Sequence, residues 1–118
     1  MTKLLTYDVI AVDEGHFFGD DLVRTATLLA NSGKLVYISA LSGSYQQRPL
    51  DTTSKLLAIA DHVEFKSAMC ACRKEAGFTH RIVPVDPENP VLVGGAESYD
   101  AICRQCLVKK TLNWQIPL

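Results

Sequence analysis

The sequence predicts an α/β fold, in which a short parallel sheet with flanking helices is followed by a smaller zinc ribbon. Two observations predict it. Over residues 1–67, short apolar runs alternate with segments of helical periodicity, an order typical of a parallel sheet covered by helices. After residue 67, two closely spaced cysteine pairs bracket a strand-like, turn-rich segment, and paired cysteines of this kind usually build a tetrahedral zinc site. We therefore expect an α/β part over residues 1–67 and a metal-binding part over residues 68–118.

The N-terminal part opens with a strand and a helix. Residues 7–12 are rich in β-branched and aromatic side chains, and the run is short enough for a buried strand. Apolar residues then recur at helical spacing, with Asp20 or Asp21 as the expected N-cap and Gly33 as the expected stop.

The same alternation continues with a second strand over residues 35–41, a second helix over residues 51–60 and a third strand over residues 63–66. Ligands of parallel sheets bind beyond the carboxyl ends of the strands. The residues after the first strand and the SGSYQQ loop after the second are therefore candidate binding positions.

Charge and composition exclude several classes of function. The formal net charge of −1 provides no basic surface for nucleic acid. Asp8 interrupts the only apolar run near the N-terminus, so we expect neither a signal peptide nor a membrane span. We expect a cytoplasmic protein, in which cysteines are thiols or metal ligands rather than disulfides.

The four cysteines favour one structural zinc site over four unrelated thiols. Cys103 and Cys106 have the ordinary spacing of a zinc knuckle, whereas Cys70 and Cys72 are closer together than usual. The expected ligands are Cys70, Cys72, Cys103 and Cys106.

Two adjacent carboxylates end the first strand, in the stretch VIAVDEGHFF. Asp13 and Glu14 repel each other when both are ionised, so a cation, a substrate proton or solvent must compensate. An apolar strand that ends in Asp-Glu resembles a Walker B strand, whose aspartate holds magnesium. Solvated residues at the start of a loop are the alternative. The phosphate-binding pattern G-x-x-x-x-G-K-[ST] has no match in the 118 residues, so we do not expect this chain to bind ATP unaided.

Together these segments resemble the cellular, zinc-containing class of thymidine kinases. The resemblance runs through VIAVDEGHFF, ALSGSYQQRPL, CRKEAGFTHR and VLVGGAESYDAICRQC, in the order of the family. It implies a P-loop-kinase-type sheet and a zinc ribbon with a lasso loop over the substrate. The implied reaction is ATP-dependent phosphorylation of deoxythymidine at the 5′-hydroxyl.

The resemblance also implies roles for individual residues. Glu14 falls on the position of the general base and Asp13 on that of the magnesium ligand, while His16 replaces the family's glutamine. Tyr45 replaces a phenylalanine of the nucleoside pocket, and Leu50 replaces another. The implied contacts with deoxythymidine or a thymidine nucleotide are Phe17, Leu41, Tyr45, Leu50, Thr79, the lasso residues Pro90, Val91, Leu92, Val93 and Gly94, and Tyr99.

The sequence departs from the family pattern in two places. At the first knuckle the expected position holds Met69, so either Cys70 moves in by a local backbone shift, or the site has three thiolates or is empty. The family's N-terminal phosphate-binding segment also has no counterpart, so the resemblance is to the acceptor-side portion. We expect a homo-oligomer or association with a P-loop-bearing kinase chain. A non-catalytic module that binds nucleosides or regulates a kinase is the alternative function.

Overall fold

A computed structural model describes residues 3–82 and 99–111. The chain forms two compact units, one of residues 1–44 and 48–63 and the other of residues 45–47 and 64–118. The first unit ends a few residues before the domain boundary expected after residue 67, and that boundary stays a prediction.

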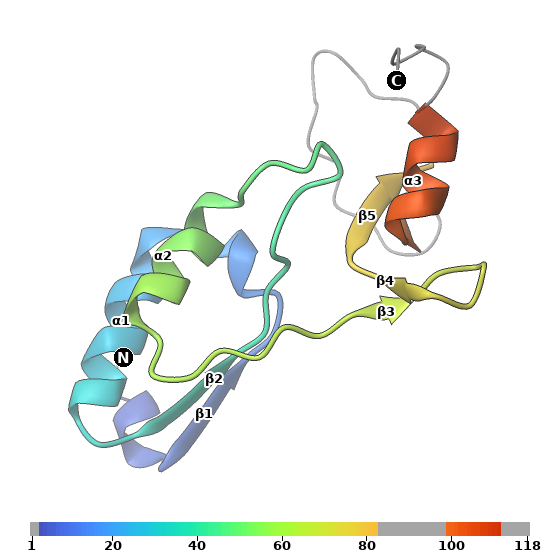
Figure 1. Cartoon of the computed structure of the whole chain (residues 1–118). Helices are drawn as coiled ribbons and strands as arrows, with labels where there is room; N and C mark the ends of the chain where they lie inside the picture. The colour runs from blue at the N-terminus through green and yellow to red at the C-terminus, as the bar shows by residue number, and fades with distance from the viewer. Residues whose placement is uncertain (1–2, 83–98, 112–118) are drawn as a thin grey trace. The chain divides into compact units, whose positions relative to one another are not determined.

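The first unit is built around two parallel strands (Figure 1). Strand β1 (Val9–Val12) pairs with β2 (Leu35–Ile38), so the carboxyl ends of both strands lie at the same edge. Helix α1 (Asp20–Asn31) packs against β2 and against α2 (Asp51–Ile59). Short 3₁₀ helices, η1 (Leu4–Thr6) and η2 (Gly15–Phe17), flank β1. The first two of the three predicted strands and both predicted helices of this region are therefore confirmed, with shorter strands than expected.

The core of this unit lies on one face of the two strands. Ile10 is buried, as are Ala26 and Leu29 of α1. The side chains of Val9, Leu35 and Tyr37 alternate with the inward-facing ones and are exposed.

The two ends of α1 differ in how well the sequence predicted them. Gly33, at a φ of +85°, stops the helix as predicted, because its N–H bonds to the Ala30 carbonyl and the Lys34 N–H to the Leu29 carbonyl. The predicted aspartate N-cap is wrong. Gly19 occupies that position without a side-chain cap bond, and Asp20 and Asp21 lie inside the first turn.

The predicted third strand over residues 63–66 is also wrong. These residues are in no strand, and Val63 and Phe65 are exposed. A strand needs a hydrogen-bonded neighbour, and no strand within residues 3–82 and 99–111 pairs with this segment. The α/β class is confirmed. The described part of the chain forms three two-stranded sheets, of which one is parallel, and the P-loop-kinase type of the parallel sheet stays a prediction.

The described residues of the second unit form two antiparallel strand pairs and a helix. Strand β3 (Ala68–Met69) pairs with β4 (Glu75–Ala76), and β5 (Phe78–Arg81) pairs with β6 (Tyr99–Ile102). Helix α3 (Arg104–Thr111) follows β6. The small core of the second unit is formed by Cys70, Ala76, Ile102, Cys103 and Leu107. In the part of the chain that is described, no helix is long and apolar enough to cross a membrane.

Candidate functional site

The turn after β1 is tied to the end of β2 by backbone hydrogen bonds. The Ser39 N–H donates to the Val12 carbonyl at 2.9 Å, and the Gly15 N–H donates to the Ser39 carbonyl at 2.8 Å. A Cβ atom at Gly15 would lie 2.5 Å from Cγ2 of Ile38, closer than side chains approach. Glycine is therefore required for the turn to lie this close to β2.

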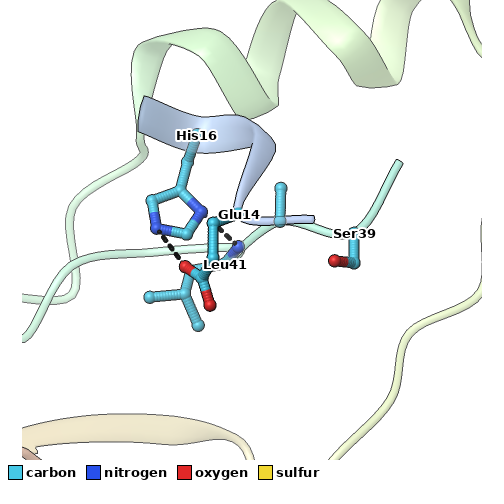
Figure 2. A pocket seen from close by; sticks show the side chains of 5 residues that line it. Glu14, His16, Ser39 and Leu41 are labelled. Carbon is cyan, nitrogen blue, oxygen red and sulfur yellow. Dashed lines mark hydrogen bonds and ion pairs between the residues drawn. The ribbon is translucent and has the colours of Figure 1, made fainter. Parts of the chain in front are cut away.

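Glu14 has a left-handed backbone, with φ 56° and ψ 42°. This conformation is uncommon for a residue with a side chain, and it occurs preferentially at functional sites. It turns the chain sharply between β1 and η2, and the Glu14 carboxylate consequently lies beside η2 (Figure 2).

Asp13 is held by two donors on one oxygen. The Ser39 hydroxyl and the Glu14 N–H both donate to Oδ1, the latter at 2.9 Å. The Ser39 hydroxyl and then the Glu14 amide hold the pKa of Asp13 below its ordinary value, because both stabilise the carboxylate. Both donors bind Oδ1, and no described residue donates a hydrogen bond to Oδ2. This second oxygen is therefore open to a cation.

His16 makes contacts through both ring nitrogens (Figure 2). The Leu41 N–H donates to Nδ1 at 3.1 Å, and Nε2 lies 3.1 Å from Oε2 of Glu14. Only 4% of the His16 side chain is exposed, against 58% for Glu14. The Nε2 contact is close but not aligned as a hydrogen bond. The backbone of the loop after β2 thus holds the imidazole through Nδ1, and Nε2 faces the Glu14 carboxylate.

A small cavity of about 160 Å³ opens beside these groups, lined by Glu14, His16, Ser39, Ala40 and Leu41. The Thr53 hydroxyl of α2 donates to the Leu41 carbonyl at 2.7 Å and so holds the loop in place. The Phe17 ring lies 4.2 Å from the imidazole, centre to centre, and is itself exposed. Three residues predicted for the site, Glu14, Leu41 and Phe17, are therefore gathered around His16.

Leu50, another predicted contact, immediately precedes α2. Its carbonyl accepts hydrogen bonds from the Ser54 N–H at 3.0 Å and from the Ser54 hydroxyl at 3.2 Å. Its side chain is half-buried. Leu50 thus contributes to the start of α2.

The second unit brings together two other predicted contacts. The rings of Tyr45 and Tyr99 lie 6.5 Å apart, and the Arg81 guanidinium lies 5.5 Å from the Tyr45 ring centre. Both ring distances are within the range of favourable aromatic and cation–π contacts. Thr79, half-buried on β5, pairs with Ala101 of β6. The predicted lasso, residues 90–94, lies outside the described residues.

The four cysteines form a compact cluster. Their sulfur atoms all lie within 4.8 Å of one another, and Sγ of Cys72 and Sγ of Cys103 are 3.5 Å apart. A zinc ion bound to four thiolates at about 2.3 Å separates the sulfurs by roughly 3.8 Å. The donor set and its spacing therefore fit a tetrahedral metal site.

The ambiguity between Met69 and Cys70 is resolved in favour of Cys70. Met69 is 72% exposed, whereas Cys70 is 4% exposed and belongs to the cluster. The hairpin turn makes this possible, because Arg73 adopts a φ of 72° and its N–H donates to the Cys70 carbonyl at 2.8 Å. The tight spacing of Cys70 and Cys72 is accommodated by this local backbone conformation.

The thiols of the cluster differ in acidity. The backbone N–H groups of Cys72 and Cys103 lower the pKa of Cys70 to about 6, and the N–H of Cys106 lowers the pKa of Cys103. The neighbouring Cys103 and Cys72 sulfurs raise the pKa of Cys106 to about 12. Four thiolates this close need a cation before all can ionise, so a metal ion that bound to this cluster would displace protons from the thiols.

Two contacts of candidate site residues were not predicted from the sequence. Ser39 had no assigned role, although it directly follows a strand parallel to the one that ends at Asp13, and such neighbours meet at the same edge. Arg81 lies two residues beyond Thr79 on β5, so alternation along the strand signalled a shared face. Its contact with Tyr45 joins residues far apart in the sequence, and no local pattern predicts that contact.

The fold and site thus define an α/β chain with a pair of carboxylates at a strand end and a separate four-cysteine cluster. A family model described as thymidine kinase matches residues 1–107, and the chain belongs to the thymidine kinase family.

Individual relatives agree with this assignment. The chain is 42% identical over 101 residues to thymidine kinase 1 of Dictyostelium discoideum, covering 85% of the chain and 43% of that protein. It is 36% identical over 118 residues to the thymidine kinase of raccoon poxvirus, covering 92% and 64%. It is 35% identical over 105 residues to that of sheeppox virus strain KS-1, covering 88% and 58%. The chain therefore spans about half the length of these relatives.

Proposed function

We propose that this chain provides the acceptor side of a thymidine kinase, which transfers the γ-phosphoryl group of ATP to the 5′-hydroxyl of deoxythymidine. The observation that carries the proposal is the pair of carboxylates at the end of β1: Asp13 accepts from the Ser39 hydroxyl, while Glu14 lies beside His16 and lines a cavity. Family membership supplies the class of reaction.

Glu14 is the general base in this proposal. Its carboxylate is 58% exposed beside the cavity, so a hydroxyl can reach it. The 5′-hydroxyl gives its proton to Glu14 while its oxygen bonds to the γ-phosphorus, and the bond from that phosphorus to the β–γ bridging oxygen breaks. The products are thymidine 5′-monophosphate and ADP, and the proton leaves Glu14 for solvent.

Asp13 is the proposed ligand of the magnesium ion that accompanies ATP. The open Oδ2 supports this role, as does the lowered pKa, since magnesium is commonly bound through one or two carboxylates and the substrate phosphates. Magnesium would neutralise charge on the phosphates during transfer. Ser39 and the Glu14 amide orient the Asp13 carboxylate.

The proposed nucleoside contacts are those that the family resemblance implies. The cavity beside Glu14 is smaller than the roughly 300–1,000 Å³ of ligand pockets. We assign it to the sugar end, next to the reacting hydroxyl, with Leu41 and Phe17 beside it. In the second unit, the adjacent rings of Tyr45 and Tyr99 support a role in nucleoside binding. Thr79, Leu50 and residues 90–94 complete the proposed set.

The proposed metal of the cysteine cluster is structural zinc. Four thiolates leave no open coordination position, which is the pattern of structural rather than catalytic zinc. Thiolate ligands must stay reduced, so the proposal includes a cytoplasmic setting. It also includes assembly as a homo-oligomer or with a P-loop-bearing kinase chain.

Radiolabelled phosphoryl transfer tests this function. The natural protein, given Mg-ATP labelled at the γ-phosphate, is expected to convert thymidine to labelled thymidine 5′-monophosphate and to leave deoxyguanosine unlabelled. Calorimetric titration of the 118-residue chain is expected to show heat with thymidine and none with Mg-ATP alone. Thymidine binding without any transfer by the natural protein would favour the alternative, a non-catalytic nucleoside-binding or regulatory module.

A further inference from the structure

His16 poses a question that the proposed reaction leaves open, because an imidazole 3.1 Å from the Glu14 carboxylate could compete with it as the base. A base needs a free lone pair. The Leu41 N–H donates to Nδ1 at 3.1 Å and occupies the lone pair of that nitrogen. In the neutral ring the proton is then on Nε2, so neither nitrogen can accept another.

The position of this proton on Nε2 affects the electrostatic environment of the two adjacent carboxylates. Asp13 takes its donors from the Ser39 hydroxyl and the Glu14 amide, while Nε2 of His16 faces the Glu14 carboxylate. Each carboxylate therefore has its own source of positive potential, on a different side. These donors offset the repulsion between neighbouring anions.

Burial makes the imidazole a rigid support. Only 4% of its side chain is exposed, and Nε2 is buried with the Glu14 carboxylate as its near partner among the described residues. The Nε2–H is not yet aligned as a hydrogen bond, and such contacts commonly tighten only when substrate is bound. The Glu14 side chain is 58% exposed, so an oriented donor beside it reduces the conformational entropy that the side chain loses when it takes up its catalytic position.

We propose that His16 is a positioning residue, which is held in its Nε2–H tautomer by the Leu41 amide and orients the Glu14 carboxylate toward the substrate hydroxyl. The kinetic part of this inference rests on the proposed function. Glutamine offers the same pair of groups, a carbonyl to accept the Leu41 N–H and an amide N–H to donate to Glu14. Leucine has a comparable volume and offers neither.

The first arm of the test is nuclear magnetic resonance of the chain with ¹⁵N-labelled histidine. The chain has three histidines, and the spectrum of His16→Gln identifies the His16 signals by their loss. At neutral pH we expect an unprotonated Nδ1 and a protonated Nε2, in the wild type and in Glu14→Gln alike. An Nδ1–H tautomer overturns the proposal.

The second arm is kinetic and uses the natural protein. His16→Leu is expected to lower kcat by roughly 10- to 100-fold with an unchanged Kd for thymidine, as removal of a supporting hydrogen bond does. His16→Gln is expected to restore kcat to within a few-fold of wild type. Wild-type kcat in His16→Leu, or equal losses in both variants, overturns the positioning role. An Nε2–H tautomer in a protein without turnover upholds the tautomer and refutes the proposed function alone.

Discussion

Asp13 and Glu14 are adjacent acids that the local backbone separates. The left-handed conformation of Glu14 turns its side chain toward His16, while Asp13 is held by Ser39. The turn depends on Gly15, which contacts the end of β2. The geometry of the site is thus determined by three consecutive residues and their contacts with the neighbouring strand.

Replacement of Gly15 by alanine tests this dependence at the scale of one residue. The new Cβ would lie 2.5 Å from Ile38, so either β2 or the turn must move. We expect a loss of about 1–3 kcal/mol in the free energy of unfolding, the usual range for overpacking. Denaturant unfolding measures it. Gly77→Ala is the control, since a Cβ there has no atom within 4 Å and its effect is expected to be small. Equal unfolding free energies for both variants would contradict the account of the turn.

At the scale of elements, Lys55 joins the N-terminal turns of α1 and α2. Its Nζ lies 2.6 Å from Asp20 Oδ1 and 3.2 Å from Asp51 Oδ2. Hydrogen bonding to Lys55 lowers the pKa of Asp20 below its ordinary value of 3.8, and hydrogen bonding to Asp20 raises the pKa of Lys55 above 10.5. The pair therefore connects the two helices through exposed charges.

We expect Lys55→Gln to lower Tm slightly, since exposed ion pairs are screened by solvent. A lowered carboxyl pKa stabilises the fold at pH values above the pKa of the unfolded chain. This stabilisation is lost as the pH falls through the pKa of the folded state. A raised lysine pKa stabilises the fold at pH values below the pKa of the unfolded chain. This stabilisation is lost as the pH rises through the pKa of the folded state. The difference in Tm should thus be largest between about pH 4 and pH 10 and shrink outside that window and in high salt. Lys34→Gln, whose Nζ lies 3.8 Å from Asp8, is the control. A difference that is independent of pH would argue against the ion pair.

The β3–β4 hairpin and the start of α3 are joined by the cysteine cluster. The core of the second unit is small and includes Cys70 and Cys103 themselves, so we expect metal binding to contribute directly to its folding. We expect about one zinc ion per chain by elemental analysis. Cys70→Ser should reduce the zinc content sharply and unfold the second unit, whereas Met69→Leu should change neither. Loss of zinc from Met69→Leu instead would show that methionine is the ligand.

At the scale of the whole molecule, the sequence predicted the parts whose information is local. Short apolar runs predicted β1 and β2, helical spacing predicted α1 and α2, and Gly33 predicted the end of α1. The strand expected over residues 63–66 failed because strand formation depends on a neighbouring strand, which the segment itself does not encode. The prediction of an aspartate N-cap failed because Gly19 occupies the N-cap position and the two aspartates lie in the first turn.

The candidate site was predictable to a similar extent. Glu14, Asp13 and the four cysteines were found from their spacing, since adjacent acids and paired cysteines are unusual patterns. The contacts that orient these residues were not predicted. Ser39 and the Leu41 amide come from a segment distant in sequence, and the tight turn at Arg73 that brings in Cys70 requires an unusual φ that arginine rarely adopts.

The central claim is that Glu14 removes the proton from the 5′-hydroxyl of thymidine, and Glu14→Gln in the natural protein tests it most directly. Glutamine keeps the shape of the side chain and cannot act as a base at neutral pH. The account predicts that kcat for thymidine phosphorylation falls by roughly 10²- to 10⁴-fold, the usual contribution of a general base, with an unchanged Kd for thymidine. Turnover by Glu14→Gln at the wild-type rate would contradict it.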